Sequence, residues 1–357
     1  MNNPILKKLV LCLLLSTLYS LLFTDAAFAM HISEGILPLP WAGLWFLVAL
    51  PFLIKGIFDI KKRAKENSSF KPLLGLMAAV VFVISCMPVP VPTAGTCSHP
   101  AGTGISAILV GPVMSIFVTS IALFIQALFL AHGGFTTWGA DIVSMGVGGS
   151  LAAYFAFKIL RRLKAPLFFS GFVAGILADW VTYIITSFEL ASALHGSKPF
   201  LPLFTTILVA FIPTQLPLGI LEGFLTAGMI VFVSKRRPDI LSQLSVVSFQ
   251  PSVKRKMKEK IKILLFTFLA VSSLLLAGSR KLLADSWPGV DVSVVEKVAE
   301  EHGRSAWTPF INTDQGDLLL FVFLLAGISG GFVLGYCWRK LFVEKDDLKH
   351  DKRDIQR

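Results

Sequence analysis

Residues 105–131 read ISAILVGPVMSIFVTSIALFIQALFLA, a run without any charged side chain. About 20 apolar residues are enough to cross the hydrocarbon core of a bilayer as a helix, and this run is longer than that. Gly111-Pro112 interrupts the run, and a Gly-Pro pair ends or kinks a helix. The stretch therefore predicts membrane-embedded helix with a break at Gly111-Pro112.

The rest of the 357-residue chain has the same character. It is 54% hydrophobic and only 15% charged, which excludes an ordinary soluble domain and indicates an all-α polytopic membrane protein. Further apolar runs lie at residues 41–60, 73–87, 139–157, 167–190, 204–233, 263–278 and 318–338.

The net charge of +11 comes from short basic clusters between the apolar runs. Such clusters mark cytoplasmic loops. A nucleic-acid-binding surface would also be basic, but these clusters alternate with membrane segments, so we expect no nucleic acid partner. The basic clusters are Lys61-Lys62-Arg63, Arg161-Arg162, Lys235-Arg236-Arg237, Lys254-Arg255-Lys256 and Arg339-Lys340.

Residues 1–29 have the three parts of a secretory signal: a basic start, an apolar run from Leu9 to Phe23, and the small-residue motif Ala27-Phe28-Ala29. We predict cleavage after Ala29, which leaves Met30 as the mature N-terminus on the outer side. The alternative is an uncleaved first membrane helix, since the apolar run is long enough for either.

The basic clusters also constrain the number of crossings. If Met30 is outside, the Lys61 loop is inside, the loop at 88–104 is outside and Arg161 is inside. The chain then crosses an odd number of times between residues 104 and 160. Either one apolar run is re-entrant, or short broken helices give three crossings. We favour three, which predicts about seven helices in the core and two in a C-terminal hairpin.

Cleavage before Met30 would create a metal chelate. The Met30 α-amine, the His31 amide nitrogen and His31 Nδ1 can close two small rings around one ion, placing three nitrogens in a plane. A fourth nitrogen in that plane suits Ni(II), Cu(II) or low-spin Co(II), whereas Mg²⁺ and Ca²⁺ prefer oxygen and zinc a tetrahedral set.

His99 is the best fourth donor, because it lies on the loop predicted to face the same side as Met30. That loop, PVPVPTAGTCSHPAGTG at 88–104, cannot be regular helix. The alternative interpretation of His99 is a structural one, as a helix cap or a hydrogen-bonded side chain. Cys97 is a rival ligand whose alternative role is a small buried apolar residue. Ser98 is a candidate for supporting the site from outside the ligand set.

His132 and Asp141 are interpreted as supporting residues rather than ligands. Acidic residues in or near apolar runs are functional candidates by default, but one satisfied by a neighbouring helix end is equally common; here they are Asp141, Asp179 and Glu222. The sequence has no His-Glu-x-x-His, Walker A or Gly-x-Ser-x-Gly motif, so no hydrolase or ATPase site is expected.

Four stretches, in this order, resemble the substrate-binding (S) component of energy-coupling factor (ECF) cobalt/nickel importers, the CbiM/NikM family. The resemblance implies that the transported Co(II) or Ni(II) is held by the Met30 amine, the His31 backbone nitrogen and imidazole, and the His99 imidazole. It also implies a transport subunit without a permanent cofactor. The stretches are MHISEG at 30–35, GTCSHPAGTG at 95–104, QALFLAHGGFTTWGAD at 126–141 and PLGILEG at 217–223. Asp141 departs from the family's usual asparagine.

The resemblance implies partners and a location. The partners are a transmembrane coupling (T) protein and a pair of ATP-binding cassette ATPases, in the lipid of a prokaryotic cell membrane, with the C-terminus cytoplasmic. The tail resembles the small CbiN/NikN partner, with an unrelated two-helix anchor as the alternative. The expected divisions are 1–29 (signal peptide), 30–240 (metal-binding core), 241–262 (cytoplasmic linker), 263–340 (CbiN/NikN-like part with an outer loop) and 341–357 (charged tail).

Two other functions are alternatives. A stand-alone secondary permease or channel would need coupled ionisable residues across the core, and the sequence has only scattered acids. A membrane metalloprotease would need a metal-bound catalytic water, for which a filled planar nitrogen set leaves little room. Four nitrogen donors accept nickel and cobalt alike, so the sequence does not choose between these ions.

Overall fold

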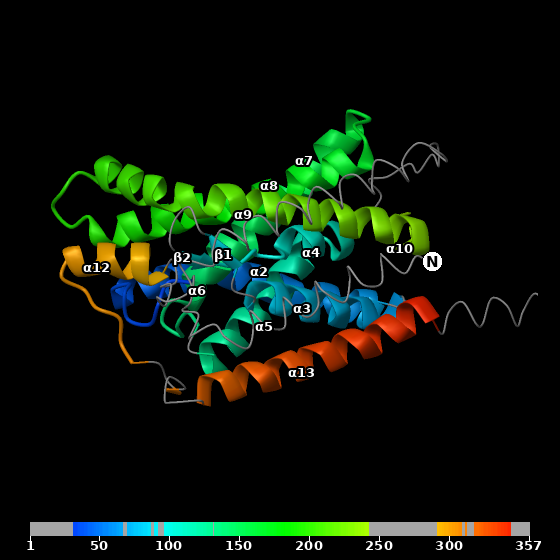
Figure 1. Ribbon diagram of the computed structural model, residues 1–357, viewed down its shortest axis with the longest axis horizontal. Helices are drawn as coiled ribbons and strands as arrows, with labels where there is room; N and C mark the ends of the chain where they lie inside the picture. The colour runs from blue at the N-terminus through cyan, green and yellow to red at the C-terminus, as the bar shows by residue number, and fades with distance from the viewer. Residues whose placement is uncertain are drawn as a thin grey trace, which may run out of the picture.

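The computed structural model describes residues 31–66, 70–86, 89–91, 96–130, 132–242, 291–308, 311–312 and 318–343. These residues are helical apart from irregular loops and one small hairpin (Figure 1). Within the described ranges, five segments are long and apolar enough to cross a membrane, and α3 (Phe70–Cys86) is a slightly shorter apolar helix. The five are α2 (Leu39–Glu66), α5 (Pro112–Phe129), Trp138–Arg162, α8 (Leu167–Leu194) and α9 (Phe200–Arg236). The prediction of an all-helical polytopic protein is confirmed.

The predicted break at Gly111-Pro112 is present. The short helix α4 (Thr103–Val110) ends at Gly111, whose φ of +91° favours glycine, and Pro112 opens α5. Arg63 Nη1 donates to the Val110 carbonyl oxygen at 3.3 Å. The turn between α4 and α5 therefore lies beside the basic C-terminal end of α2.

In the Pro-rich stretch before α4, the residues that the structure describes are non-helical, as predicted. Within it, β1 (Val89–Val91) pairs antiparallel with β2 (Thr96–Ser98), and Val89 lies opposite Ser98. An irregular stretch from His99 to Gly102 then leads into α4.

The membrane-length segment Trp138–Arg162 is continuous but not uniform. It consists of α6 (Trp138–Asp141), the π-helical η1 (Ile142–Gly149) and α7 (Ser150–Arg162). π-Helical turns inside a longer helix are uncommon and are often found at functional sites. Here the wider turn begins directly after the buried Asp141.

Helices α8 and α9 run side by side as a long hairpin (Figure 1). Glycine makes the close approach possible: a Cβ on Gly175 would lie 2.6 Å from the Glu222 carbonyl oxygen. Small residues at such contacts let helix backbones pack tightly in membranes. The hairpin carries three fully or almost fully buried acids, Asp179, Glu189 and Glu222.

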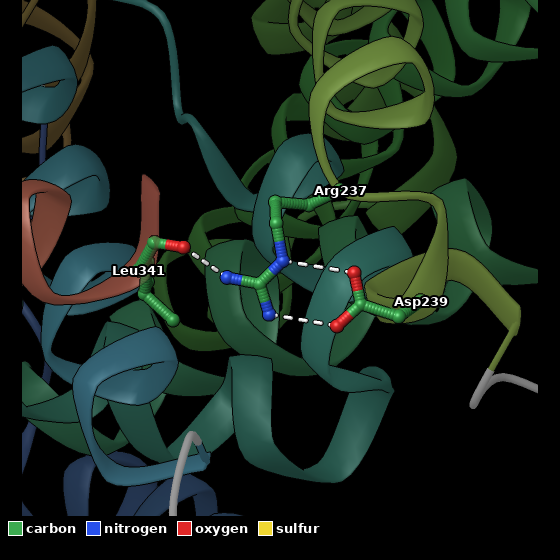
Figure 2. Close-up of polar contacts among 3 residues, drawn as sticks. All are labelled: Arg237, Asp239 and Leu341. Atoms are coloured by element: carbon green, nitrogen blue, oxygen red, sulfur yellow. Dashed lines mark hydrogen bonds and ion pairs between the residues drawn. The ribbon is translucent and has the colours of Figure 1, made fainter. Parts of the chain in front are cut away.

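The apolar run at 318–338 forms a helix, α13 (Leu318–Trp338), which packs along α3. Its end continues into η4 (Arg339–Val343), and Trp338 stacks on Phe232 of α9 at 5.4 Å. Figure 2 shows a polar link at the same end: the Arg237 guanidinium donates to the Leu341 carbonyl and to both oxygens of Asp239, in α10 (Pro238–Ser242), at 2.7 and 2.8 Å. The predicted span at 263–278 lies outside the described residues.

At the opposite end of the molecule lie η3 (Asp291–Glu296) and α12 (Lys297–Glu301) (Figure 1). The stretch from 291 to 308, called the 291–308 segment below, falls in what the sequence suggested was a plain polar loop. Val294, Val295, Val298 and Ala299 are buried against the core. Their helical spacing gives the segment an apolar face that holds it on the rest of the protein.

Candidate metal centre

The residues after Met30 are tied to the loop between α5 and α6. The Glu34 carboxylate accepts hydrogen bonds from the backbone N–H groups of Phe135 and Thr136, the latter at 3.1 Å. In return, the Gly35 N–H donates to Thr136 Oγ1 at 3.1 Å. Two stretches about 100 residues apart in the sequence therefore form one interlocked unit.

Ile32, directly after His31, is fixed from both sides. Its N–H donates to Asp141 Oδ1 at 3.1 Å, and its carbonyl accepts from Thr137 Oγ1 at 2.5 Å. A buried hydrogen bond is shielded from water, so it holds the backbone of Ile32 firmly in place. Asp141 therefore positions the backbone beside His31, which fits the supporting role predicted for it.

Three histidines meet under this unit: His31, His99 and His132. One ring nitrogen from each lies within 4.8 Å of the others. Their exposed fractions are 7%, 4% and 5%, and the ring centroids are 4.9 to 5.1 Å apart. Three buried imidazoles at this spacing can converge on a single ion, and imidazole suits nickel, copper, zinc and cobalt.

The hydrogen bonds of His31 select one tautomer. His31 Nε2 lies 3.0 Å from Gln126 Oε1, and Gln126 Nε2 donates to Ser85 Oγ at 2.6 Å. Since the amide nitrogen of Gln126 is used as a donor, its oxygen must accept from His31 Nε2–H. This leaves the lone pair on His31 Nδ1, the nitrogen that the chelate requires.

The contacts of His99 favour the other tautomer. His99 Nδ1 lies 3.2 Å from the Pro100 carbonyl oxygen, which can only accept, so Nδ1 carries the proton. The His99 Nε2 lone pair then accepts from His132 Nε2–H at 2.8 Å. An ion that bound His99 Nε2 would therefore have to replace His132 as its partner.

Burial keeps these imidazoles neutral. Desolvation lowers the pKa of His99 to about 4. Burial lowers the pKa of His31 and of His132 well below the usual value, with a further lowering from neighbouring histidines. Neutral imidazole is the form that ligates metals, so all three rings are in the ligating form at neutral pH.

A small cavity adjoins the cluster, with a lining that is largely polar apart from Met145, Ala101 and the Tyr183 ring. The imidazoles of His31 and His99 therefore face a small cavity with polar side chains rather than closely packed apolar side chains. Its polar lining includes Asp141, Ser144, Thr182 and Thr186.

The structure groups the predicted site residues unevenly. His31 and His99 come together as expected, and His132 lies at hydrogen-bonding distance from His99. Ser98 accepts a hydrogen bond from Gln215 of α9. Met30 is outside the described residues, and the Cys97 backbone lies in β2. Gln126 is a further site residue that the sequence does not predict, although a lone amide inside an apolar run is a signal for it.

A comparison with protein families identifies the family of this chain. Residues 31–240 match the family model CbiM, described as the cobalt uptake substrate-specific transmembrane region. The chain belongs to the CbiM family. It is therefore a transmembrane transport protein for a transition metal and not an enzyme.

Individual CbiM relatives support the assignment over most of the chain. The "Cobalt transport protein CbiM" of Geobacter sulfurreducens is 59% identical over 327 residues, covering 91% of this chain and 94% of the relative. The protein of the same name from Sorangium cellulosum is 54% identical over 222 residues, covering 62% of this chain and 99% of the relative. The first match therefore includes the tail, and the second does not extend over the whole chain.

The fold has also been seen in crystals. A crystal structure of a truncated transition metal transporter superposes with a TM-score of 0.51 at 24% identity, covering 58% of this chain and 99% of that one. A second transition metal transporter gives the same TM-score and covers 60% of this chain. These likenesses place the CbiM-family core in a known fold.

Proposed function

We propose that this chain is the substrate-binding subunit of an ATP-driven ECF importer of Co(II) or Ni(II). The observation that carries the proposal is the cluster of His31, His99 and His132, neutral and buried in a CbiM-family protein. The sequence has no nucleotide-binding motif, so energy comes from a transmembrane coupling protein and a pair of ATP-binding cassette ATPases. The relatives named cobalt transport protein favour cobalt as the first ion to test.

The proposed ligands are the Met30 amine, the His31 amide nitrogen and Nδ1, and His99 Nε2. The tautomer that Gln126 selects in His31 supports this set, as does the lone pair that His99 directs toward His132. The ion then replaces His132 as the partner of His99 Nε2, and His132 remains beside the ion. Cobalt and nickel both accept four nitrogens in a plane.

We propose seven core crossings. The stretch from His99 through α4 crosses inward to Gly111, α5 returns outward to His132, and Trp138–Arg162 crosses inward again. The contact between Arg63 and Val110 supports an inner position for the Gly111 turn. The mature N-terminus would then lie outside and the C-terminus in the cytoplasm, as the positions of the basic clusters require.

Gln126 provides the first prediction. Replacing it with methionine keeps its approximate volume but removes the acceptor that orients His31 Nε2–H. We expect Co(II) affinity to fall about 10- to 100-fold, the usual cost of losing an outer partner of a metal-ligating histidine. A competitive metal titration of the purified protein measures it.

The control is Thr119→Val, on the same helix. Thr119 is buried, and its hydroxyl has no hydrogen-bond partner among the described residues. Affinity should change less than twofold in this variant. Equal losses in both variants would mean that α5 packing, and not the orientation of His31, is being measured.

The tail is proposed to be a CbiN/NikN-like part that helps to load metal. In the 291–308 segment, Arg304 donates to the carbonyls of Ile36 and Gly35 at 2.5 and 2.6 Å, and the Trp307 N–H donates to the Glu34 carbonyl at 2.7 Å. The segment thus holds the backbone that directly follows His31, where it can control the approach of an ion.

Replacing Arg304 with alanine should slow metal loading several-fold and change equilibrium affinity by less than about twofold, since no ligand is lost. Stopped-flow mixing of the purified full-length protein with Co(II) gives the rate. Lys297→Ala removes a positive charge from an exposed position on the same segment and is the control. An unchanged loading rate in Arg304→Ala would argue against a loading role.

The transport proposal is tested by Co(II) uptake in cells that express the chain with or without its coupling protein and ATPases. We expect uptake to require the ATPases. Undiminished uptake in their absence would instead identify a stand-alone permease.

A further inference from the structure

One helix contacts the loop of His99 on both sides of the histidine. Before it, Gln215 Nε2 of α9 donates to Ser98 Oγ at 2.8 Å. After it, the Glu222 carboxylate accepts from the Ala101 N–H at 2.7 Å and from the Gly102 N–H at 3.0 Å. His99 therefore lies between two attachments to the same helix.

The two attachments belong to one face of α9. Gln215 and Glu222 are seven residues apart, which is two helical turns, so their side chains point the same way. Both are buried, with exposed fractions of 3% and 1%. Hydrogen bonds shielded from water in this way hold their geometry more firmly than exposed ones.

Glu222 also provides a hydrogen-bond acceptor at the N-terminus of α4. The first N–H groups of a helix lack partners within it, and negative charge near a helix N-terminus is stabilising. The residue before α4 is Gly102, whose φ is +72° and which provides no side-chain cap. Glu222 supplies the missing acceptor from another helix, so the position of α4 and of the preceding loop depends on α9.

We propose that Gln215 and Glu222 are positioning residues that place His99 for metal binding, so that His99 moves together with α9. This inference rests on the proposed function, because it assumes that His99 is a ligand. It adds that affinity depends on α9, and that a displacement of α9 relative to the segment after Met30 would separate His99 from His31. Ion release then needs no change at His99 itself.

The test uses the full-length protein purified from membranes, with Co(II) alone as the probe. Glu222→Gln keeps the side-chain shape but presents an amide N–H₂ where one backbone N–H expects an acceptor. Gln215→Met removes the bond to Ser98. We expect affinity to fall about 10- to 100-fold in Glu222→Gln and about tenfold in Gln215→Met. The visible absorption of the Co(II)-saturated variants should shift toward that of His99→Ala, since the fourth nitrogen is misplaced in each.

Two matched controls separate positioning from packing. Ser192→Ala removes a buried hydroxyl of α8 that donates to the Phe188 carbonyl oxygen of the same helix. Thr214→Val changes the residue next to Gln215. Among the described residues, the Thr214 hydroxyl donates only to the Phe211 carbonyl oxygen of the same helix. Both should keep wild-type affinity and spectrum, whatever they do to the melting temperature.

The outcomes are distinct. If Glu222→Gln and Gln215→Met melt earlier but keep wild-type affinity and spectrum, the contacts are structural only and the inference is overturned. If Glu222→Gln does not fold, the result for Gln215→Met decides. If the wild-type protein binds no Co(II), or His99→Ala binds as well as wild type, the proposed function fails first.

Discussion

Replacing His99 with alanine is expected to weaken Co(II) and Ni(II) binding by more than about 100-fold, beyond the 10- to 100-fold typical for losing an outer-shell partner. The reason is that the His99 imidazole is the proposed fourth in-plane nitrogen. The three donors at Met30 and His31 would remain, with water in the vacated position. A metal titration of the purified protein, with cobalt absorption recorded in parallel, measures both the loss and the changed geometry.

His132→Ala is the comparison that gives this experiment its meaning. His132 lies as close to His99 as a hydrogen bond allows, at 2.8 Å. As a supporting residue it should cost about 10- to 100-fold when removed and leave the cobalt spectrum close to wild type. A loss equal to that of His99→Ala, with the same spectral change, would make His132 a ligand. Wild-type binding by His99→Ala would rule out the proposed ligand set.

Blocking removal of the leader is expected to abolish high-affinity binding altogether. Leucine at both Ala27 and Ala29 removes the small residues that signal cleavage requires, so Met30 would keep a peptide bond in place of an amine. The chelate would then lose the amine donor and the ring that contains it. Mass spectrometry of the N-terminal peptide establishes the processing state, and titration of the same preparation gives the affinity.

Cys12→Ser, inside the leader but away from the cleavage motif, is the control for this variant. It should be processed at Met30 and should bind metal normally. Tight binding by a protein shown to start at Met1 would contradict the amine as a ligand, and Cys97 would become the next donor to examine. A wild-type protein that starts at Met1 would have the same meaning.

Much of the fold could be predicted because hydrophobicity and chain breakers report directly on membrane helices. The run at 167–190 became α8, the run at 318–338 became α13, and Gly111-Pro112 became the junction of two helices. The sequence does not predict the helix within the 291–308 segment, because its apolar face consists of only four small aliphatic residues in a hydrophilic stretch. A pattern of that size becomes convincing only once the surface it covers is known.

The site was harder to predict than the helices. His31 and His99 were recognised through the chelate chemistry of the N-terminus. The nearness of His132 and Gln126 depends on α5 returning to the level of His31, which no local pattern encodes. The double attachment of the His99 loop to α9 likewise joins residues more than 100 positions apart.

The depth of the histidine cluster affects how quickly an ion can arrive and leave. Because each imidazole keeps an exposed fraction of at most 7%, an ion cannot reach the ring nitrogens by collision with the closed protein. Capture then requires the protein to open and expose the rings. The capture rate depends on how often this happens and falls below the diffusion limit. If the cluster binds the ion as proposed, the same burial slows escape to the outside and lengthens the time that the ion stays bound.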